Sequence, residues 1–324
     1  MTVPRFVIFG AGAIGGVVGA QLARAERDVV LIARGKHAGA MQTDGLKLQH
    51  GEQTDVFFPT VVTSVNDIGW REDDVVLLTV KSQDTLDAVS GLALAAPPSI
   101  AVVCAQNGVD NERVVLRLFA NTYGAVVMMP AGHLSPGVVQ AHSWPVPGLI
   151  DVGRYPSGHD DTAAAIVATL NAVGFNCVVR DDVMRWKYTK LLMNLANAVI
   201  ALCGFGGEAA ADLRRAARDE GTAVLRAAGI DYASEEEDRE RRADIMTLVP
   251  IEGKTRTGGS TWQSLARGTG TIETNWLNGE IVALGRRHGV PTPVNEVLQR
   301  TTNQAARDGL PPESLDPSNI LAML

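Results

Sequence analysis

Hydrophobic and polar positions follow two different patterns along this chain, and the change falls near residue 180. Before it, short runs of consecutive apolar residues alternate with segments of helical spacing. Runs that are apolar at successive positions are typical of strands buried on both faces of a sheet. Strands are expected at residues 5–9, 28–33, 75–80, 100–104 and 123–129, with helices at 13–25, 84–92 and 111–119. This alternation predicts an α/β domain with a doubly wound parallel sheet.

The pattern changes after residue 132. Residues 137–141 and 148–152 flank a proline-rich turn and are expected to form a hairpin, followed by a helix at 160–172 and a strand at 175–180. Beyond residue 182, helices are expected at 183–203, 207–228, 235–247, 261–288 and 293–308. The charged run at 235–242 is interpreted as a solvated helix. A chain of 324 residues is longer than an ordinary domain with a single core. We therefore expect a sheet domain at 1–180 and an all-helical domain at 181–324.

Composition narrows the classes of function. A net charge of −7 argues against nucleic acid or an anionic membrane surface as a partner. No targeting signal is found and no apolar stretch reaches the roughly 20 residues that span a bilayer, so we expect a cytoplasmic protein. The three cysteines form no C-x-x-C pair and are expected to be reduced, and the six histidines show no metal-site spacing.

A glycine-rich segment, Gly10-Ala-Gly12-Ala-Ile-Gly15, follows the first strand and opens the first helix. The spacing alone is a weak signal, but in this context it predicts a dinucleotide site of the Rossmann type. Gly10 permits the tight turn, Gly12 admits the pyrophosphate, and Gly15 lets the helix approach the sheet. Ala13 and Ile14 lie in the same turn, at the positive helix end, and are expected to contact the cofactor. The alternative is a glycine turn without a ligand.

The end of the second strand indicates which dinucleotide is bound. Sites for NAD or FAD usually carry Asp or Glu there, to bind the ribose hydroxyl. This chain has Arg34, followed by Lys36, while Asp28 lies at the start of the strand. A guanidinium can bind a 2′-phosphate through two hydrogen bonds, so the predicted cofactor is NADP(H). A solvated loop arginine is the alternative.

Two further polar residues follow strands of the same sheet. Lys81 comes after the strand at 75–80, and Asn107 comes after the strand at 100–104. Ligands of open α/β sheets bind outside the carboxyl ends of the strands, so both are candidates to contact nicotinamide, ribose or a substrate carboxylate. The alternatives are a surface-loop lysine and an Asn-Gly turn made for backbone reasons.

A polar stripe runs along the helix expected at 183–203. Lys190, Asn194 and Asn197 lie at i, i+4 and i+7 on one face of a largely apolar helix, with Lys187 one turn earlier. Buried polar groups cost free energy unless they are satisfied, and an anionic, carbonyl-bearing ligand would satisfy them. Backbone groups of neighbouring helices are the alternative partners.

Two further candidates are Ser260, just before the helix expected at 261–288, and Glu273 within it. Ser260 can bind a carboxylate, and Glu273 needs a cationic partner if it is buried. Taken alone, each fits a binding site and a surface position equally well.

Together these motifs resemble the ketopantoate reductase family. The shared segments are G-A-G-A-I-G-G, L-x-x-R, V-K-S, Q-N-G, W-x-x-x-K-x-x-x-N, G-S-x-x-Q-x-L-x-R-G and E-x-x-x-x-N-G, and they extend over nearly the whole chain. The resemblance implies a Rossmann domain with an all-helical domain and an active site between them. It also implies reduction of ketopantoate to pantoate, a step of pantothenate biosynthesis. The oligomeric state is left open, with a homodimer as one candidate.

The resemblance also implies residue roles. Gly10, Gly12, Gly15 and Arg34 would bind NADPH, and Lys81 and Asn107 would contact cofactor or substrate. Lys190 would donate the proton, Asn194 and Ser260 would hold the 2-oxo acid, with Asn197 beside them, and Glu273 would anchor the network. Lys190 is favoured over Lys187 because it lies one turn before Asn194 and deeper in the apolar part of the helix, whereas Lys187 is expected to be a rim charge.

Two departures from the family pattern fall among the substrate residues. Ala198 stands where a second asparagine is usual, and Thr271-Ile-Glu273-Thr replaces T-E-I-D with one residue added after Arg267. The predicted activity is therefore an NADPH-dependent reduction of a small anionic 2-oxo acid. An NADP-dependent 3-hydroxy acid dehydrogenase and a non-catalytic NADP(H) sensor remain the alternatives.

Overall fold

The computed structural model describes residues 4–253 and 258–324 and divides into two compact units. The first unit comprises Met1–Gln106, Asp110–Met184 and Glu235–Arg256, and the second comprises Asn107–Val109, Arg185–Ser234 and Thr257–Leu324. Apart from Asn107–Val109, the chain enters the helical unit after Met184, and residues 235–253 return to the first unit.

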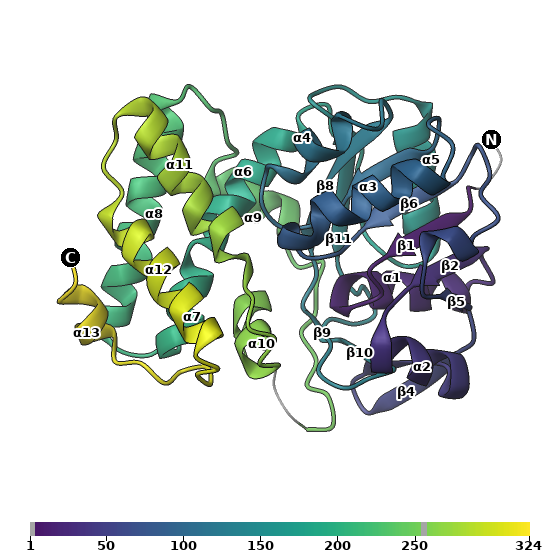
Figure 1. Cartoon of the computed structure of the whole chain (residues 1–324), viewed down its shortest axis with the longest axis horizontal. Coiled ribbons are helices and arrows are strands. Elements are labelled where there is room, and N and C mark those ends of the chain that lie inside the picture. The colour runs from purple at the N-terminus through teal and green to yellow at the C-terminus, as the bar shows by residue number, and fades with distance from the viewer. Residues whose placement is uncertain (1–3, 254–257) are drawn as a thin grey trace. The chain divides into compact units, whose positions relative to one another are not determined.

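The first unit is built on a seven-stranded sheet in the order β11-β8-β7-β6-β1-β2-β5 (Figure 1). Neighbouring strands are parallel except for β11 and β8, which are antiparallel. Its strands are β1 (Phe6–Phe9), β2 (Val29–Ile32), β5 (Thr60–Val62), β6 (Val75–Leu78), β7 (Ala101–Cys104), β8 (Thr122–Met128) and β11 (Leu149–Arg154). Every residue of β1, β2, β6 and β7 is buried, as consecutive apolar runs predict.

Helices cover both faces of this sheet. Successive side chains of each strand point to opposite sides, so each face has its own hydrophobic core. Phe6 and Ile8 of β1 belong to one core cluster, while Val7 and Phe9 belong to another. The first cluster also receives side chains of α1 (Ala13–Arg24) and α5 (Asp161–Ala172), and the second those of α3 (Thr85–Ala95) and α4 (Asn111–Leu116). The predicted doubly wound α/β architecture is confirmed.

A second, four-stranded sheet was not anticipated from the pattern. Its order is β4-β3-β10-β9, and its strands are β3 (Leu46–His50), β4 (Gln53–Phe57), β9 (Ala131–Gly132) and β10 (Val138–Ala141); α2 (Gly35–Asp44) precedes it. The expected hairpin is wrong: β10 pairs with β3 and β9, while β11 joins the main sheet beside β8. The expected strand at 175–180 is also absent, because only isolated bridges join Asn176 to Leu149 and Val179 to Val152.

The second unit is helical, and its described residues include no strand (Figure 1). Its elements are α6 (Val183–Asn194), α7 (Ala196–Cys203), α8 (Glu208–Ala227), α10 (Ser260–Ala266), the 3₁₀ helix η3 (Glu273–Trp276), α11 (Asn278–His288), α12 (Pro293–Arg307) and α13 (Pro317–Leu321). The single helix expected at 183–203 is interrupted at Leu195, whose carbonyl accepts a hydrogen bond from Asn278 Nδ2 at 3.2 Å. The helix expected at 261–288 is broken at Gly268 and Gly270, which have positive φ, so Glu273 lies in η3 instead of an α-helix.

The charged helix α9 (Glu235–Arg242) belongs to the first unit and is only partly solvated. Arg241 is 12% exposed and binds Asp151 of β11, which is 4% exposed, with Nη2 at 2.5 Å from Oδ1 and Nε at 2.8 Å from Oδ2. Arg180 donates to the same carboxylate from Nε at 3.1 Å. The interpretation of the whole charged run as a solvated face is therefore wrong, and the helix ends five residues early, before Ala243 with φ 31°.

Candidate functional site

The glycine loop between β1 and α1 is shaped by close backbone contacts in the first unit. Gly10 has φ +106°, and a Cβ added there would lie 2.9 Å from the backbone nitrogen of Val80. A Cβ on Gly15 would lie 2.4 Å from the carbonyl oxygen of Gly10. Thr79 Oγ1 also donates to Gly10 O at 2.7 Å. Glycine is therefore required at both positions for α1 to approach β1 and β6.

Gly12 is not restricted by close packing as Gly10 and Gly15 are. A Cβ added to Gly12 has no atom within 4 Å, and no side chain caps the amino end of α1. Gly12, Ala13 and Ile14 are all partly exposed. The amide groups of the first helical turn are therefore accessible to an anion, and the helix dipole favours negative charge there. This geometry fits the pyrophosphate of a dinucleotide.

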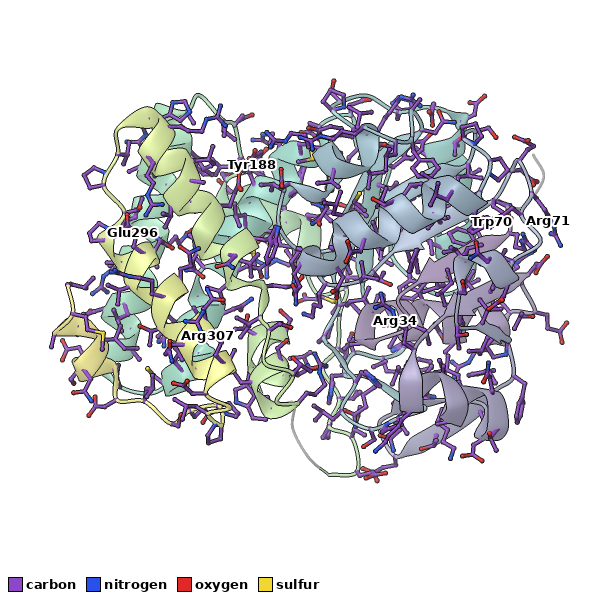
Figure 2. All side chains as sticks on the ribbon, viewed as in Figure 1. Arg34, Trp70, Arg71, Tyr188, Glu296 and Arg307 are labelled. Carbon is purple, nitrogen blue, oxygen red and sulfur yellow. The ribbon has the colours of Figure 1, made fainter. Side chains whose placement is uncertain are left out.

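Arg34 lies just beyond the carboxyl end of β2, as the residue that precedes α2, and is labelled in Figure 2. Its side chain is exposed and makes no hydrogen bond or ion pair with the described residues. Asp28, at the opposite end of β2, instead pairs with Arg71 at 2.7 Å. The guanidinium of Arg34 is thus available to an anion, whereas the carboxylate of Asp28 is occupied elsewhere.

His37, in the first turn of α2, was not selected from the sequence. Its ring lies 2.7 Å from the carbonyl oxygen of Ala11, in the glycine loop, and 2.9 Å from the amide nitrogen of Gly137. Burial holds the pKa of His37 below its usual value of 6.5, although the hydrogen bond to Ala11 opposes part of this effect. A single histidine in an amphipathic helix gives no signal of such long-range contacts.

Lys81 immediately precedes the 3₁₀ helix η2 (Ser82–Asp84) after β6, next to a buried polar network. Gln106 Nε2 donates to Thr85 Oγ1 at 2.9 Å, and Thr85 Oγ1 donates to Asn111 Oδ1 at 2.8 Å. Asn111 Nδ2 in turn donates to Ser82 Oγ at 3.3 Å. These groups are buried and hydrogen-bonded to one another. They therefore fix the chain at the carboxyl ends of β6 and β7, where Lys81 lies.

In the second unit, the polar stripe of α6 continues across the interruption into α7. Lys190 and Asn194 lie one turn apart on α6, and Asn197 Nδ2 donates to Asn194 Oδ1 at 3.2 Å. Asn194 Nδ2 is buried and has no hydrogen-bond partner among the described residues. An unsatisfied buried amide is costly, and a ligand oxygen would satisfy it.

Ser260 and Asn107 lie near the same amides within the second unit. Gly259, which precedes α10, faces Asn197: a Cβ there would lie 3.4 Å from Asn197 Oδ1. Asn107 Nδ2 is 3.5 Å from Ser260 Oγ, with Gly108 at φ +81° directly after it. The predicted residues Asn107, Asn197 and Ser260 are thus gathered in one unit, together with Asn194.

Glu273 is buried in η3, and its charge acts on Arg267 at the end of α10. Burial lowers the pKa of Arg267, and the nearby Glu273 carboxylate raises it in part. Arg267 Nη2 also lies 3.4 Å from Ser264 Oγ. Arg267 therefore provides positive charge beside Glu273, a role that the sequence did not single out although Arg267 lies in the quoted G-S-x-x-Q-x-L-x-R-G segment.

The two lysines of α6 differ in solvent exposure, in the sense opposite to the expectation. Lys187 is 3% exposed, whereas Lys190 is partly exposed. The expectation that Lys187 is a solvated rim charge is wrong, because this turn of α6 is packed into the protein and Trp186 and Thr189 beside it are also buried. Lys190 is thus the more accessible of the two lysines.

The described residues provide neither a membrane-spanning helix nor a metal-binding cluster. No helix there is long and apolar enough to cross a membrane. No group of three or more His, Cys, Asp or Glu side chains within residues 4–253 and 258–324 is arranged to hold a metal ion.

The parallel sheet, its glycine loop and the accessible amino end of α1 define a dinucleotide-binding fold of the Rossmann class, accompanied by a helical unit. The family models for ketopantoate reductase PanE/ApbA and for its C-terminal region match residues 6–157 and 182–306. The chain belongs to the ketopantoate reductase family.

Individual relatives agree over almost the full length. The 2-dehydropantoate 2-reductase of Pyrococcus horikoshii is 28% identical over 91% of this chain and 95% of its own. A PanE/ApbA family ketopantoate reductase from Ralstonia eutropha has a TM-score of 0.78 at 30% identity, covering 94% of this chain and 99% of its own. A D-mandelate dehydrogenase structure with NADH and anilino(oxo)acetate has a TM-score of 0.80 at 19% identity, covering 94% and 99%, and shares the fold.

Proposed function

We propose that this protein is an NADPH-dependent reductase that converts a small anionic 2-oxo acid to the 2-hydroxy acid, as 2-dehydropantoate 2-reductases do. The observation that carries the proposal is the buried, unpartnered Nδ2 of Asn194, one helical turn from Lys190. A donor that lacks a partner in the protein is suited to a substrate oxygen. Relatives named 2-dehydropantoate 2-reductase support the same reaction.

The first unit would hold the cofactor. Gly10, Gly12, Ala13, Ile14 and Gly15 form the turn that would receive the pyrophosphate, because no side chain caps the amino end of α1 and Gly12, Ala13 and Ile14 are partly exposed. Arg34, exposed and unpaired among the described residues, would bind the 2′-phosphate. NADPH, when bound, supplies the hydride that reduces the carbonyl carbon.

The second unit would hold the substrate and supply the proton. Asn194 and Ser260 would bind the oxo acid, with Asn197 and Asn107 in their hydrogen-bonded surroundings. Lys190 would donate its proton to the carbonyl oxygen as negative charge builds there. Lys81, following β6, would contribute positive charge toward cofactor or substrate. Glu273, buried beside Arg267, would anchor this network.

A substrate panel tests the proposal. Oxidation of NADPH and of NADH is followed by absorbance with 2-oxo acids, ketopantoate among them, with neutral ketones and with 3-oxo acids. We expect turnover with NADPH and at least one 2-oxo acid. Turnover of neutral ketones alone contradicts the oxo-acid assignment, and exclusive use of 3-oxo acids supports the 3-hydroxy acid dehydrogenase alternative. Dinucleotide binding without turnover of any compound supports a sensor.

A further inference from the structure

His37 makes two hydrogen bonds that join separate parts of the first unit. One is with the carbonyl oxygen of Ala11, between Gly10 and Gly12, where Nε2 lies at 2.7 Å. The other comes from the amide of Gly137, which donates to Nδ1 at 2.9 Å. The imidazole therefore connects the first turn of α2 to the glycine loop and to the residues that precede β10.

These partners define the protonation state of the ring. An amide N–H can only donate, so Nδ1 of His37 must be the unprotonated acceptor for Gly137. The proton then lies on Nε2 and is donated to Ala11 O, which can only accept. His133 packs against the same ring, with centroids 4.1 Å apart, and its own Nδ1 lies 3.0 Å from Val138 O. Both nitrogens of His37 are thus engaged in the neutral form.

The contact with Ala11 acts on the peptide that leads into the amino end of α1. The Ala11 carbonyl belongs to the same peptide plane as the amide of Gly12, which donates to Gly10 O at 2.7 Å, while a side chain at Gly12 would meet no atom within 4 Å. Glycine loses more conformational freedom on ordering than any other residue. A hydrogen bond that orients this peptide before binding reduces the ordering cost that the dinucleotide would otherwise bear.

We propose that His37 is a positioning residue for dinucleotide binding, which fixes the glycine loop relative to the start of α2. Arg34 immediately precedes α2, three residues before His37, so the same contact holds the proposed 2′-phosphate site and the pyrophosphate turn in a constant relation. The proposal rests on the proposed use of a dinucleotide. It concerns the loop alone, and does not depend on which carbonyl compound is reduced.

Two substitutions separate the two hydrogen bonds of His37. In His37→Gln the amide nitrogen reaches about as far as Nε2 and can still donate to Ala11 O, while the acceptor for Gly137 is lost. In His37→Asn the shorter side chain places an oxygen near Nδ1 and can accept from Gly137, but it does not reach Ala11. Both variants lose one hydrogen bond, so they serve as matched controls for general destabilisation.

Dissociation constants for NADPH and NADH are measured by fluorescence titration, together with thermal unfolding. We expect His37→Asn to weaken both dinucleotides about fivefold to tenfold, since one hydrogen bond is lost and the pyrophosphate is common to both. His37→Gln should bind within about twofold of the unmodified protein at a similarly reduced unfolding temperature. Equal binding by the two variants, whether weak or normal, overturns the proposal.

A measurement on the unmodified protein is independent of how the variants fold. NMR of isotope-labelled histidine should show His37 as the Nε2–H tautomer, and an Nδ1–H tautomer overturns the proposal. If the protein binds neither dinucleotide, the proposed function and this inference fail together. If it binds NADPH and reduces no oxo acid, the proposed reaction fails, while the two variants still decide the role of His37.

Discussion

Arg34 is exposed beyond the carboxyl end of β2, where an anion can approach it without displacing another partner among the described residues. We expect Arg34→Ala to weaken NADPH binding by about tenfold to a hundredfold, because a charge-assisted hydrogen bond contributes about 1.5–3 kcal/mol. NADH binding should barely change, since NADH lacks the 2′-phosphate. Titration of both dinucleotides measures this, and Lys36→Ala is the matched control. Equal titration curves for NADPH and NADH with the unmodified protein contradict the assignment.

Lys190 and Lys187 lie on the same helix but in different surroundings, so their substitution should have different effects. Lys190→Ala should lower kcat by about 10²–10⁴, the usual contribution of general acid catalysis, with NADPH binding nearly unchanged. Lys187 is buried, so Lys187→Ala should mainly reduce stability, by more than the ~1 kcal/mol of an exposed ion pair. Steady-state kinetics and urea unfolding measure the two effects. A larger kcat loss in Lys187→Ala would assign the proton donor to the earlier turn.

At the scale of elements, the helix α9 is held to the sheet by a charge pair more than by apolar packing. Arg241 binds Asp151 of β11 through two short hydrogen bonds and also donates to Asn176 Oδ1 at 2.9 Å. Arg241→Met should reduce the free energy of unfolding by about 1.5–3 kcal/mol. The loss is limited because Arg180 still pairs with Asp151.

Urea unfolding checks this value, and Arg239→Met on the same helix is the control. Arg239 is exposed, so its substitution should change the free energy by no more than about 0.5 kcal/mol. Equal effects of the two substitutions would show that the buried pair contributes no specific stabilisation.

At the scale of the whole molecule, the first unit is assembled from separate parts of the chain. Beyond α9, Trp144 N donates to Thr247 O at 3.0 Å, and Val249 N donates to His142 O at 3.0 Å. A fragment of residues 1–184 lacks these contacts and that of Arg241. The Rossmann unit therefore depends on a segment that follows much of the helical unit in sequence.

We expect the fragment 1–184 to unfold about 3–12 °C below a fusion in which a Gly/Ser linker joins it to residues 235–253. This range combines the loss of one charged contact with the usual temperature shift per kcal/mol for a domain of this size. Circular dichroism during heating measures both proteins. Identical transitions would show that residues 1–184 form a self-sufficient domain.

Local sequence patterns determined much of this protein. The buried strands β1, β2, β6 and β7 were recognisable because each is apolar on both faces, which leaves a continuous hydrophobic run. The glycine loop was recognisable because the turn at Gly10 and the helix contact at Gly15 admit no side chain. Arg34, which replaces an acidic residue, indicated the proposed cofactor for a similarly local reason.

Only the tertiary structure decided the features that depend on partners distant in sequence. The pairing of β10 with β3 joins segments about ninety residues apart, and the proline-rich turn gave no information about it. Burial of Lys187, the pairing of Arg241 with Asp151, and the two bonds of His37 likewise depend on groups brought together by folding. Periodicity shows which face of an element is apolar, whereas the identity of the facing element is set by the packing of the whole chain.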